Sequence, residues 1–455
     1  SPEDDAEVRR ISLTNRSDRP REIELTSYVE LAMGLVVEDF AHPAFGRLFV
    51  ETEWVAECTA LTARRRPRAV HEPTLFAFHV LSIDGRTQAQ VEWETDRLRF
   101  LGRGRGPDDP VALDGRALSG TTGAVLDPIL SIRTRLRLAP GASARLAFTT
   151  GVASDAVSVH ALALKYNDPG VAARTFALAH THAHVSLRHL GITVEEALLF
   201  ERLGSRVFFS DGSLRGDEST TSRNTLGQSG LWVHGISGDL PIALVRVVEP
   251  DDVVLVRQVL MAHEHWRLKG LDSDVVILND HPASYRDEMH EHLVRVVEGG
   301  PWGAWKGKRG GVFLLRGDGM PEAERVLLFT AARAVLSGDR GDLPEQLDRP
   351  ETIPSHPLSE PLVDEPEPVE GAESGPLVPP LVMENGLGGF TRDGREYVVV
   401  LDGDRETPLP WVNVLANPRF GSIVTATGAA HTWAGNSREN RITPHAGDPV
   451  TDPTS

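Results

Sequence analysis

From Val8 to about Thr150, apolar and polar side chains alternate with a period of two. The segments "REIELTSYVEL", "TLFAFHVL" and "LSIRTRLRLAP" carry this alternation, and clusters such as "NRSDRP" and "APGAS" separate them. Because successive side chains of a strand point to opposite faces of its sheet, each segment predicts a half-buried strand. Many short strands with turns between them indicate an antiparallel β-sandwich, which we place at residues 1–152.

The period becomes helical at about Ala153. Apolar residues recur three and four positions apart, which predicts amphipathic helices, and Gly191 is a natural stop for one of them. Thr193 and Glu196 have the spacing of a capping box at the start of the next helix. Further helices are predicted at "VVLVRQVLMAHEHWRLKG", "DHPASYRDEMHEHLVRVVEGG" and "PEAERVLLFTAARAVLSG", and short strands at "SDVVILN" and "GGVFLLR". We therefore predict a largely helical region with short strands at residues 153–349.

The composition changes twice more toward the end of the chain. Residues 350–380 are rich in proline and acidic residues, which predicts an extended linker because such a segment buries too little apolar surface to order itself. From residue 381 to residue 455, alternating and turn-rich segments resume, with Asn385-Gly386 as one turn candidate. These segments predict a second, incomplete β-sandwich. The fold class is therefore multi-domain α+β.

Charge and cysteine content restrict the function. A net charge of −18 argues against nucleic-acid binding, which needs clusters of basic residues. The single cysteine, Cys58, excludes an internal disulfide and a cysteine-based zinc site, and it is consistent with a cytoplasmic location. His180 and His184 supply two zinc ligands, fewer than the three or four that a site needs. We therefore predict no metal, no cofactor and no membrane segment in this chain.

The strongest candidate site lies near the end of the chain. Planar amides, guanidinium groups and indole rings gather there on a loop, and these groups suit a ligand with many hydroxyls, such as a carbohydrate. The candidate substrate-binding residues are Trp411, Asn413, Trp433, Asn436, Arg438, Glu439, Asn440 and Arg441. In an alternative interpretation, Arg438, Glu439 and Arg441 pair with one another and only hold the loop rigid.

A second candidate lies in "NTLGQSGLWVHGISGDLPIALVRV". A sugar-contacting turn would use Trp232 to stack on a pyranose face and Asp239 to bond its hydroxyls. The alternative is that Asp239 only caps the following helix or strand.

Several long motifs resemble a known family. The segments "ENGLGGFTRDGREYVVVL", "TPLPWVNVLANPRFGSIVTATGAAHTWAGNSRENRITP" and "DPVTDP" resemble the amino-terminal sandwich of glycoside hydrolase family 94, the inverting sugar phosphorylases. The segments "SPEDDAEVRRISLTNRSDRPREIELTSYVEL", "DFAHPAFGRLFVETEW", "LSGTTGAVLDPI" and "GQSGLWVHGISGDLPI" are similar to the tandem sandwich and helical region of cyclic β-1,2-glucan synthases and β-1,2-glucan phosphorylases. The resemblance covers nearly the whole chain except the linker.

This resemblance implies a supersandwich fold and an order of parts. In a synthase, a glycosyltransferase portion in the bacterial inner membrane would precede these domains, and an (α/α)₆ barrel would follow the second sandwich. In the family, an aspartic acid of the barrel is the general acid, and inorganic phosphate attacks the anomeric carbon with inversion. We therefore expect this chain to be a fragment that ends before the barrel, contains no catalytic residue and packs against the barrel near the acceptor end of the glucan.

Two functions follow from these observations. The first is the carbohydrate-binding portion of an enzyme that makes or phosphorolyses β-1,2-glucan, with glucan and, in the whole protein, phosphate as partners. The alternative is a non-catalytic carbohydrate-binding or scaffold module. An inverting hydrolase that uses water would need two opposed carboxylates ~6.5–9.5 Å apart, and the sequence shows no obvious pair.

Overall fold

The protein is described from a computed structural model. The structure describes residues 1–70, 72, 74–84, 90–209, 211–282, 287–348, 378–403, 405–425, 428 and 430–451. The chain divides into two compact units, one made of Ser1–Thr181 with Val369–Ser455 and the other of His182–Pro368. The second unit therefore interrupts the first in the sequence. Most of the predicted linker, residues 350–377, lies outside the described residues.

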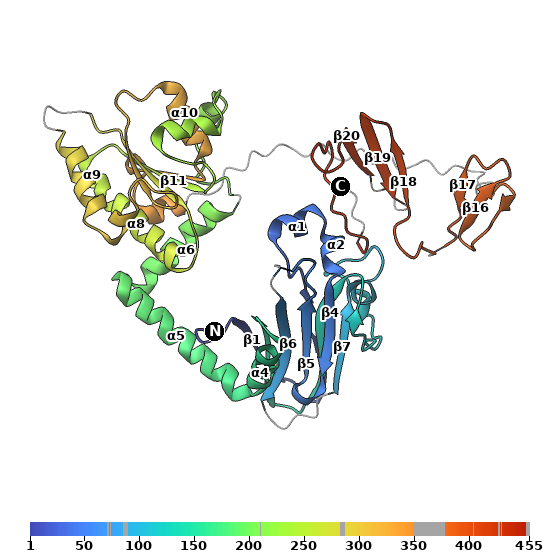
Figure 1. Cartoon of the computed structure of the whole chain (residues 1–455). Helices are drawn as coiled ribbons and strands as arrows, with labels where there is room; N and C mark the ends of the chain where they lie inside the picture. Colours follow the sequence, from blue (N-terminus) through green and yellow to red (C-terminus); the bar gives the residue numbers. More distant parts are fainter. Residues whose placement is uncertain are drawn as a thin grey trace. The chain divides into compact units, whose positions relative to one another are not determined.

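The first unit contains the predicted antiparallel β-sandwich (Figure 1). One sheet has six strands, in the order β1 (Ala6–Thr14), β10 (Ser143–Ala153), β6 (Leu75–Asp84), β5 (Ala60–Arg65), β4 (Val50–Val55) and β8 (Gly123–Ala124). The other sheet is built on β9 (Pro128–Leu138), which pairs with β2 (Arg21–Thr26), β3 (Val29–Glu30) and β7 (Gln90–Asp96). The period-two pattern is thus confirmed as the signature of two facing sheets.

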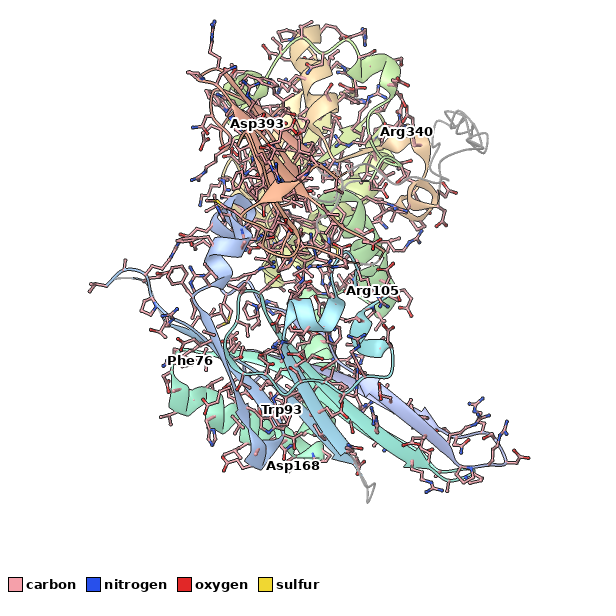
Figure 2. The ribbon with its side chains drawn as sticks, turned by 90° about the vertical axis from the view of Figure 1, so that its right-hand side faces the viewer. Phe76, Trp93, Arg105, Asp168, Arg340 and Asp393 are labelled. Carbon is pink, nitrogen blue, oxygen red and sulfur yellow. The ribbon has the colours of Figure 1, made fainter. Side chains whose placement is uncertain are left out.

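The inward-facing residues of the two sheets form the core of the sandwich. Leu61 of one sheet and Ile132 and Leu136 of the other are fully buried there. Trp54 of β4 stacks on Trp93 of β7, with ring centroids 4.1 Å apart and planes within 5° of parallel. Figure 2 marks Trp93 on its strand. Three short helices connect strands of this unit: α1 (Val36–Ala41), α2 (Pro43–Arg47) and α3 (Arg97–Leu101).

Helix α4 (Ala156–Asn167) covers part of the outer face of the six-stranded sheet. Its buried residues Val159, Ala163 and Tyr166 pack against Phe78 and Val80 of β6. Helix α5 (Pro169–Leu190) follows and ends, as predicted, at Gly191, which has a φ of +69°. A positive φ is accessible to glycine at low cost, so this residue can end the helix.

The second unit is an α/β domain with a parallel sheet of four strands. The order is β13 (Val312–Arg316), β12 (Asp274–Asn279), β11 (Ile242–Val247) and β14 (Ala334–Ser337). Helices lie on both faces: α6 (Val194–Phe208), α8 (Val253–Leu268), α9 (Glu288–Glu298) and α11 (Leu343–Leu347) on one, and α10 (Glu322–Ala331) on the other. The short α7 (Glu218–Thr221) precedes β11. The predicted capping box of Thr193 and Glu196 is present at the start of α6.

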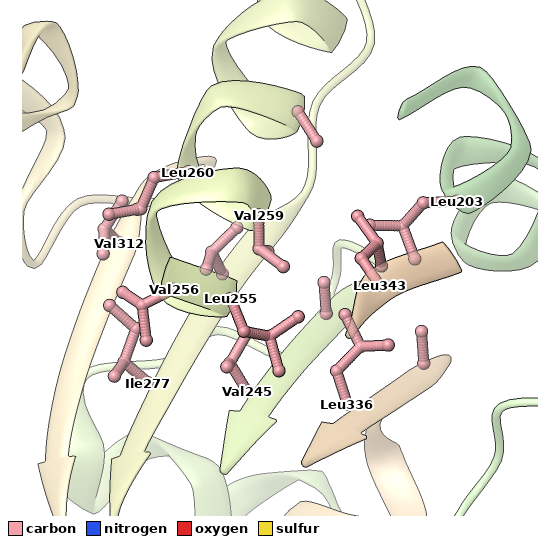
Figure 3. Close-up of a cluster of buried hydrophobic side chains, with 14 of the residues drawn as sticks. Leu203, Val245, Leu255, Val256, Val259, Leu260, Ile277, Val312, Leu336 and Leu343 are labelled. Atoms are coloured by element: carbon pink, nitrogen blue, oxygen red, sulfur yellow. The ribbon is translucent and has the colours of Figure 1, made fainter. Parts of the chain in front are cut away.

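Both faces of this sheet are buried, as is usual for a parallel sheet. Along β11, Ala243, Val245 and Val247 face one core, and Ile242 and Leu244 face the other. Figure 3 shows the first core, where side chains of α8 point at the strands. The two segments that the sequence predicted as short strands, β12 and β13, are thus part of the central sheet of this unit. The single helix predicted over "PEAERVLLFTAARAVLSG" was wrong, because α10 ends at Ala331 and the residues after Ala334 pair with β11 as β14.

The last part of the chain forms two antiparallel sheets of three strands each. The first contains β15 (Leu381–Val382), β16 (Gly388–Thr391) and β17 (Tyr397–Val399), and the second contains β18 (Val412–Ala416), β19 (Phe420–Thr425) and β20 (Ala430–Ala434). The end of this segment joins the sandwich, because Val450 is buried beside Phe100 and Leu101 of α3. None of the described helices is both long enough and apolar enough to span a bilayer.

Candidate functional site

The loop after β20 is organised by Asn436. Its Oδ1 accepts hydrogen bonds from the backbone amides of Arg438 and Glu439, both at 2.9 Å. The backbone amide of Asn440 donates to the carbonyl of Asn436 at 3.1 Å, which closes a turn of the chain. The amide oxygen of Asn436 is therefore used inside the loop, and the structure gives this residue the role of a turn former.

Two charged residues of this loop, Arg438 and Glu439, remain exposed. Arg438 pairs with Glu439 at 3.2 Å, and about two-thirds of each side chain is exposed (67% and 69%). The Nε of Arg441 is buried and has no hydrogen-bond partner among the described residues. The predicted three-way pairing is therefore formed between Arg438 and Glu439, without Arg441. The side chains of Arg438, Glu439 and Asn440 are open to contact from outside.

The aromatic candidates contribute to packing. Trp433 is buried over Gly421, where an added Cβ would lie 2.2 Å from the Cζ2 of the indole. Trp411 meets Tyr397 edge to face, with ring centroids 6.3 Å apart. Asn413 is exposed on β18 and pairs with Val424 of β19. A mainly apolar cavity of about 240 Å³ lies beside this sheet, and none of the eight candidates lines it.

The second candidate pair lies on one turn of the α/β unit. Trp232 belongs to the short 3₁₀ helix η3 (Gln228–His234), and its Nε1 donates to the carbonyl of Ser237 at 3.2 Å. Gln228 donates from Nε2 to the same carbonyl at 2.8 Å and to Oδ1 of Asp239 at 2.9 Å. Asp239 lines a cavity of about 490 Å³, whereas Trp232 does not. Asp239 precedes β11, and its carboxylate accepts a hydrogen bond from the side chain of Gln228. The alternative interpretation instead gave this carboxylate the role of capping a helix or strand.

Sequence analysis did not identify a groove of about 720 Å³ on the outer face of the six-stranded sheet. We call it the sandwich groove. Its floor is made by outward-facing residues of β4, β5 and β6, and one wall is the start of α4. Glu51, Arg64 and Phe76 form one row across the three strands, and Glu53 and Thr62 form part of the next row. Figure 2 labels Phe76 on its strand.

The groove is lined by both acidic and basic side chains. Arg64 donates from Nε and Nη2 to Oε2 of Glu51, at 2.9 and 2.6 Å. His160 of α4 lies 2.5 Å from a carboxylate oxygen of Glu57. The carboxylate of Glu53 is exposed and makes no hydrogen bond or ion pair with the part of the chain that the structure describes. The groove therefore offers one carboxylate whose lone pairs are all open to a ligand.

Only the strand register reveals this groove. In the sequence, "FVETEWV" and "ALTARRR" predict two strands with polar outer faces, which is the ordinary appearance of a solvated surface. The register places Glu51 opposite Arg64 and Glu53 opposite Thr62, and α4 then encloses them on one side. No motif in the sequence predicts that α4 returns to this face.

Comparison with known proteins agrees with this architecture. A sequence model of the glycosyl hydrolase 94 supersandwich domain matches residues 1–169 and 395–455, and both ranges belong to the first unit. The chain is also similar to the cyclic beta-(1,2)-glucan synthase NdvB of Rhizobium meliloti (strain 1021), with 34% identity over a 467-residue alignment. That alignment covers 98% of this chain, and this chain spans 16% of the length of that relative. The chain belongs to the glycosyl hydrolase 94 supersandwich family.

Proposed function

We propose that this chain is the carbohydrate-binding portion of a carbohydrate-active enzyme that makes or phosphorolyses β-1,2-glucan. Membership of the family and similarity to a glucan synthase support a glucan as the ligand. The observation that carries the proposal is the sandwich groove, because it lies within the matched residues and joins open polar groups to apolar walls.

The chemistry of the groove suits a chain of pyranose rings. Each ring has hydroxyl groups at its edge and C–H bonds on its faces. The free carboxylate of Glu53 can accept hydrogen bonds from hydroxyl protons, and the exposed guanidinium of Arg64 can donate to hydroxyl oxygens. Phe76 and Val55 give apolar surface for the C–H faces. The volume of about 720 Å³ falls within the ~300–1,000 Å³ of ligand sites.

The remaining parts of the proposal concern the whole protein. We assign the reaction with phosphate to an (α/α)₆ barrel outside this chain. The exposed side chains of Arg438, Glu439 and Asn440 are the contact that we assign to that barrel, close to the acceptor end of the glucan. Their exposure supports this role, since they are free of packing partners that a barrel would have to displace.

Calorimetric titration of the purified chain with linear β-1,2-glucan oligosaccharides tests the proposal. We expect binding, and Glu53→Ala should weaken it about tenfold, which is about 1.4 kcal/mol. Glu22→Ala is the matched control, because Glu22 is an exposed glutamate on strand β2 of the same sandwich, outside the groove. Equal affinities of Glu53→Ala and the unaltered chain would refute the groove as the site.

A second measurement separates binding from catalysis. With glucan and inorganic phosphate present, we expect no consumption of phosphate by the isolated chain. Consumption of phosphate would show that the chain carries its own catalytic groups, and it would refute the assignment of the reaction to a separate barrel. Absence of any glucan binding would leave a scaffold role as the better account.

A further inference from the structure

Two arginines meet at the amino-terminal edge of the parallel sheet. Arg333 lies between α10 and β14, and its backbone amide donates to the carbonyl of Ile242 at 2.8 Å. Arg215 precedes α7, and its Nη1 donates to the carbonyls of Thr330 and Ala332, both at 3.4 Å. The guanidinium of Arg215 therefore lies against the residue that directly precedes Arg333.

Neither arginine has a carboxylate partner among the described residues, although both are half-buried. By contrast, Arg325 of helix α10 makes two hydrogen bonds to Asp280. Burial and the nearby charge of Arg333 lower the pKa of Arg215. Two adjacent positive charges in a partly desolvated position are unfavourable unless an anion compensates them.

Arg333 lines the cavity of about 490 Å³ that Asp239 also lines. Gln228 uses both N–H groups of its Nε2, on the carbonyl of Ser237 and on Asp239, and Asn224 uses one of its two N–H groups on the carbonyl of Leu226. Arg333 is the positively charged donor of this lining, and its side chain makes no hydrogen bond or ion pair with the described residues. The second carboxylate oxygen of Asp239 and the Oε1 of Gln228 accept no hydrogen bond from the described residues.

This division of donors and acceptors matches one class of ligand. Arginine binds the oxygens of a phosphate group in a two-pronged geometry, and the neighbouring charge of Arg215 adds to the attraction. Free carboxylate and amide oxygens accept hydrogen bonds from hydroxyl groups. Leu226, Leu327 and Phe208 supply apolar walls. We propose that this cavity binds a sugar phosphate, with the phosphate on Arg333 and sugar hydroxyls on Asp239. The proposal is independent of the sandwich groove.

Titration of the full chain with glucose 6-phosphate, inorganic phosphate and glucose tests this site. We expect glucose 6-phosphate to bind most tightly. Arg333→Gln should weaken its binding at least tenfold, and Arg333→Lys should weaken it less because the charge remains. Arg309→Gln is the matched control, since Arg309 is an exposed arginine of the same unit without an ion pair among the described residues. A thermal unfolding curve of each variant verifies that it is folded.

Two results would overturn the assignment of the phosphate. One is equal affinity of the folded Arg333→Gln variant and the unaltered chain for glucose 6-phosphate. The other is binding of glucose as tightly as glucose 6-phosphate. If inorganic phosphate binds as tightly as the sugar phosphate, and Asp239→Asn changes neither, then the role given to Asp239 is refuted.

Discussion

Arg97 and Asp448 form a bidentate ion pair, with both N–O distances 2.8 Å, although 351 positions separate them in the chain. Arg97 also contacts Asp127 and Glu30, each at 3.0 Å. Burial alone would raise the pKa of Asp448, but hydrogen bonds from Arg97 and Thr451 hold it well below its usual range. The pair joins the last part of the chain to helix α3 of the sandwich unit.

Replacing Asp448 should loosen this junction. In Asp448→Asn, Arg97 keeps Asp127 and Glu30 but loses its two-pronged partner. We expect a loss of about 2 kcal/mol, below the ~3–5 kcal/mol of a fully buried pair, because Asp448 is partly exposed. Trypsin should then cut faster after Arg441. Asp402→Asn is the control, because Asp402 is exposed in the same part of the chain. Trypsin should cut this variant at the same rate as the unaltered chain. Equal rates for all three proteins would contradict the prediction.

The same junction should weaken in acid. The pKa of Asp448 is lower in the folded protein than the 3.8 of an unperturbed aspartic acid. Its contribution to stability is therefore complete above about pH 4 and is lost as the pH falls further. Trypsin is inactive in this range, so pepsin digestion between pH 4 and pH 2 is the suitable measurement. Asp448→Asn should show a smaller change across this window than the unaltered chain.

His79 should make the stability of the sandwich depend on pH in a higher range than Asp448 does. Its ring is buried between Thr150 and Ser27, with both ring nitrogens 2.8 Å from a hydroxyl oxygen. Burial, with a smaller effect of Arg9, lowers the pKa of His79 from 6.5 to about 4. The unfolded chain therefore binds a proton that the folded chain excludes, and stability falls from about pH 6.5 to about pH 4 by about 3 kcal/mol. Thermal unfolding at several pH values measures this dependence of stability on pH. The dependence should disappear in His79→Gln, and an unchanged dependence would exclude His79 as its cause.

Gly421 should tolerate no side chain. An added Cβ would lie 2.2 Å from Cζ2 and 2.3 Å from Cε2 of Trp433, so the indole would have to move. We expect Gly421→Ala to destabilise the sheet of β18–β20 by about 1–3 kcal/mol, as overpacking does. In this variant the displaced indole of Trp433 should become exposed to water, and its fluorescence should shift to longer wavelength. Gly46→Ala is the control, since a Cβ there meets nothing within 4 Å. An unshifted spectrum in Gly421→Ala would disprove the contact.

Trp266 should stabilise the α/β unit through the hydrogen bond of its indole nitrogen as well as through its size. The residue is 1% exposed, and its Nε1 donates to the carbonyl of Phe200 at 2.9 Å, which ties α8 to α6. Trp266→Phe removes this hydrogen bond and leaves unfilled space in the core, at a combined cost of about 2 kcal/mol. Trp305→Phe, at a more exposed tryptophan of the same unit, should cost little. Urea unfolding of the two variants measures the difference, and equal midpoints would contradict the expectation.

Sequence reasoning recovered the features that local physical chemistry determines. The alternation before Thr150 identified the sandwich, and Gly191 and Thr193 marked the end of one helix and the start of the next. The helix predicted to run through Val335 was wrong for a non-local reason. The four apolar residues of β14 form a strand because β11 lies beside them, and nothing nearby in the sequence encodes that neighbour.

The candidate site was predictable only in part. Planar polar residues near the end of the chain were recognised, but Asn436 and Trp433 proved to serve the loop and its sheet. Glu53 and Arg64 gave no signal, because an outward-facing glutamate or arginine on a strand is ordinary until a helix from elsewhere encloses it. Likewise, only the structure shows that Arg333 has no ion pair among the described residues.

The interruption of the first unit by the second sets an order of events during synthesis. Val450 can reach its place beside Leu101 only after the whole α/β unit has left the ribosome. Until then, the part of the first unit before Thr181 lacks its last segment, residues 369–455, and the surface of α3 that Val450 covers is exposed. Closing a flexible loop costs entropy that grows slowly with its length, and a folded unit within the loop removes much of that freedom. Prompt folding of the middle unit thus governs how long that surface stays open to other chains.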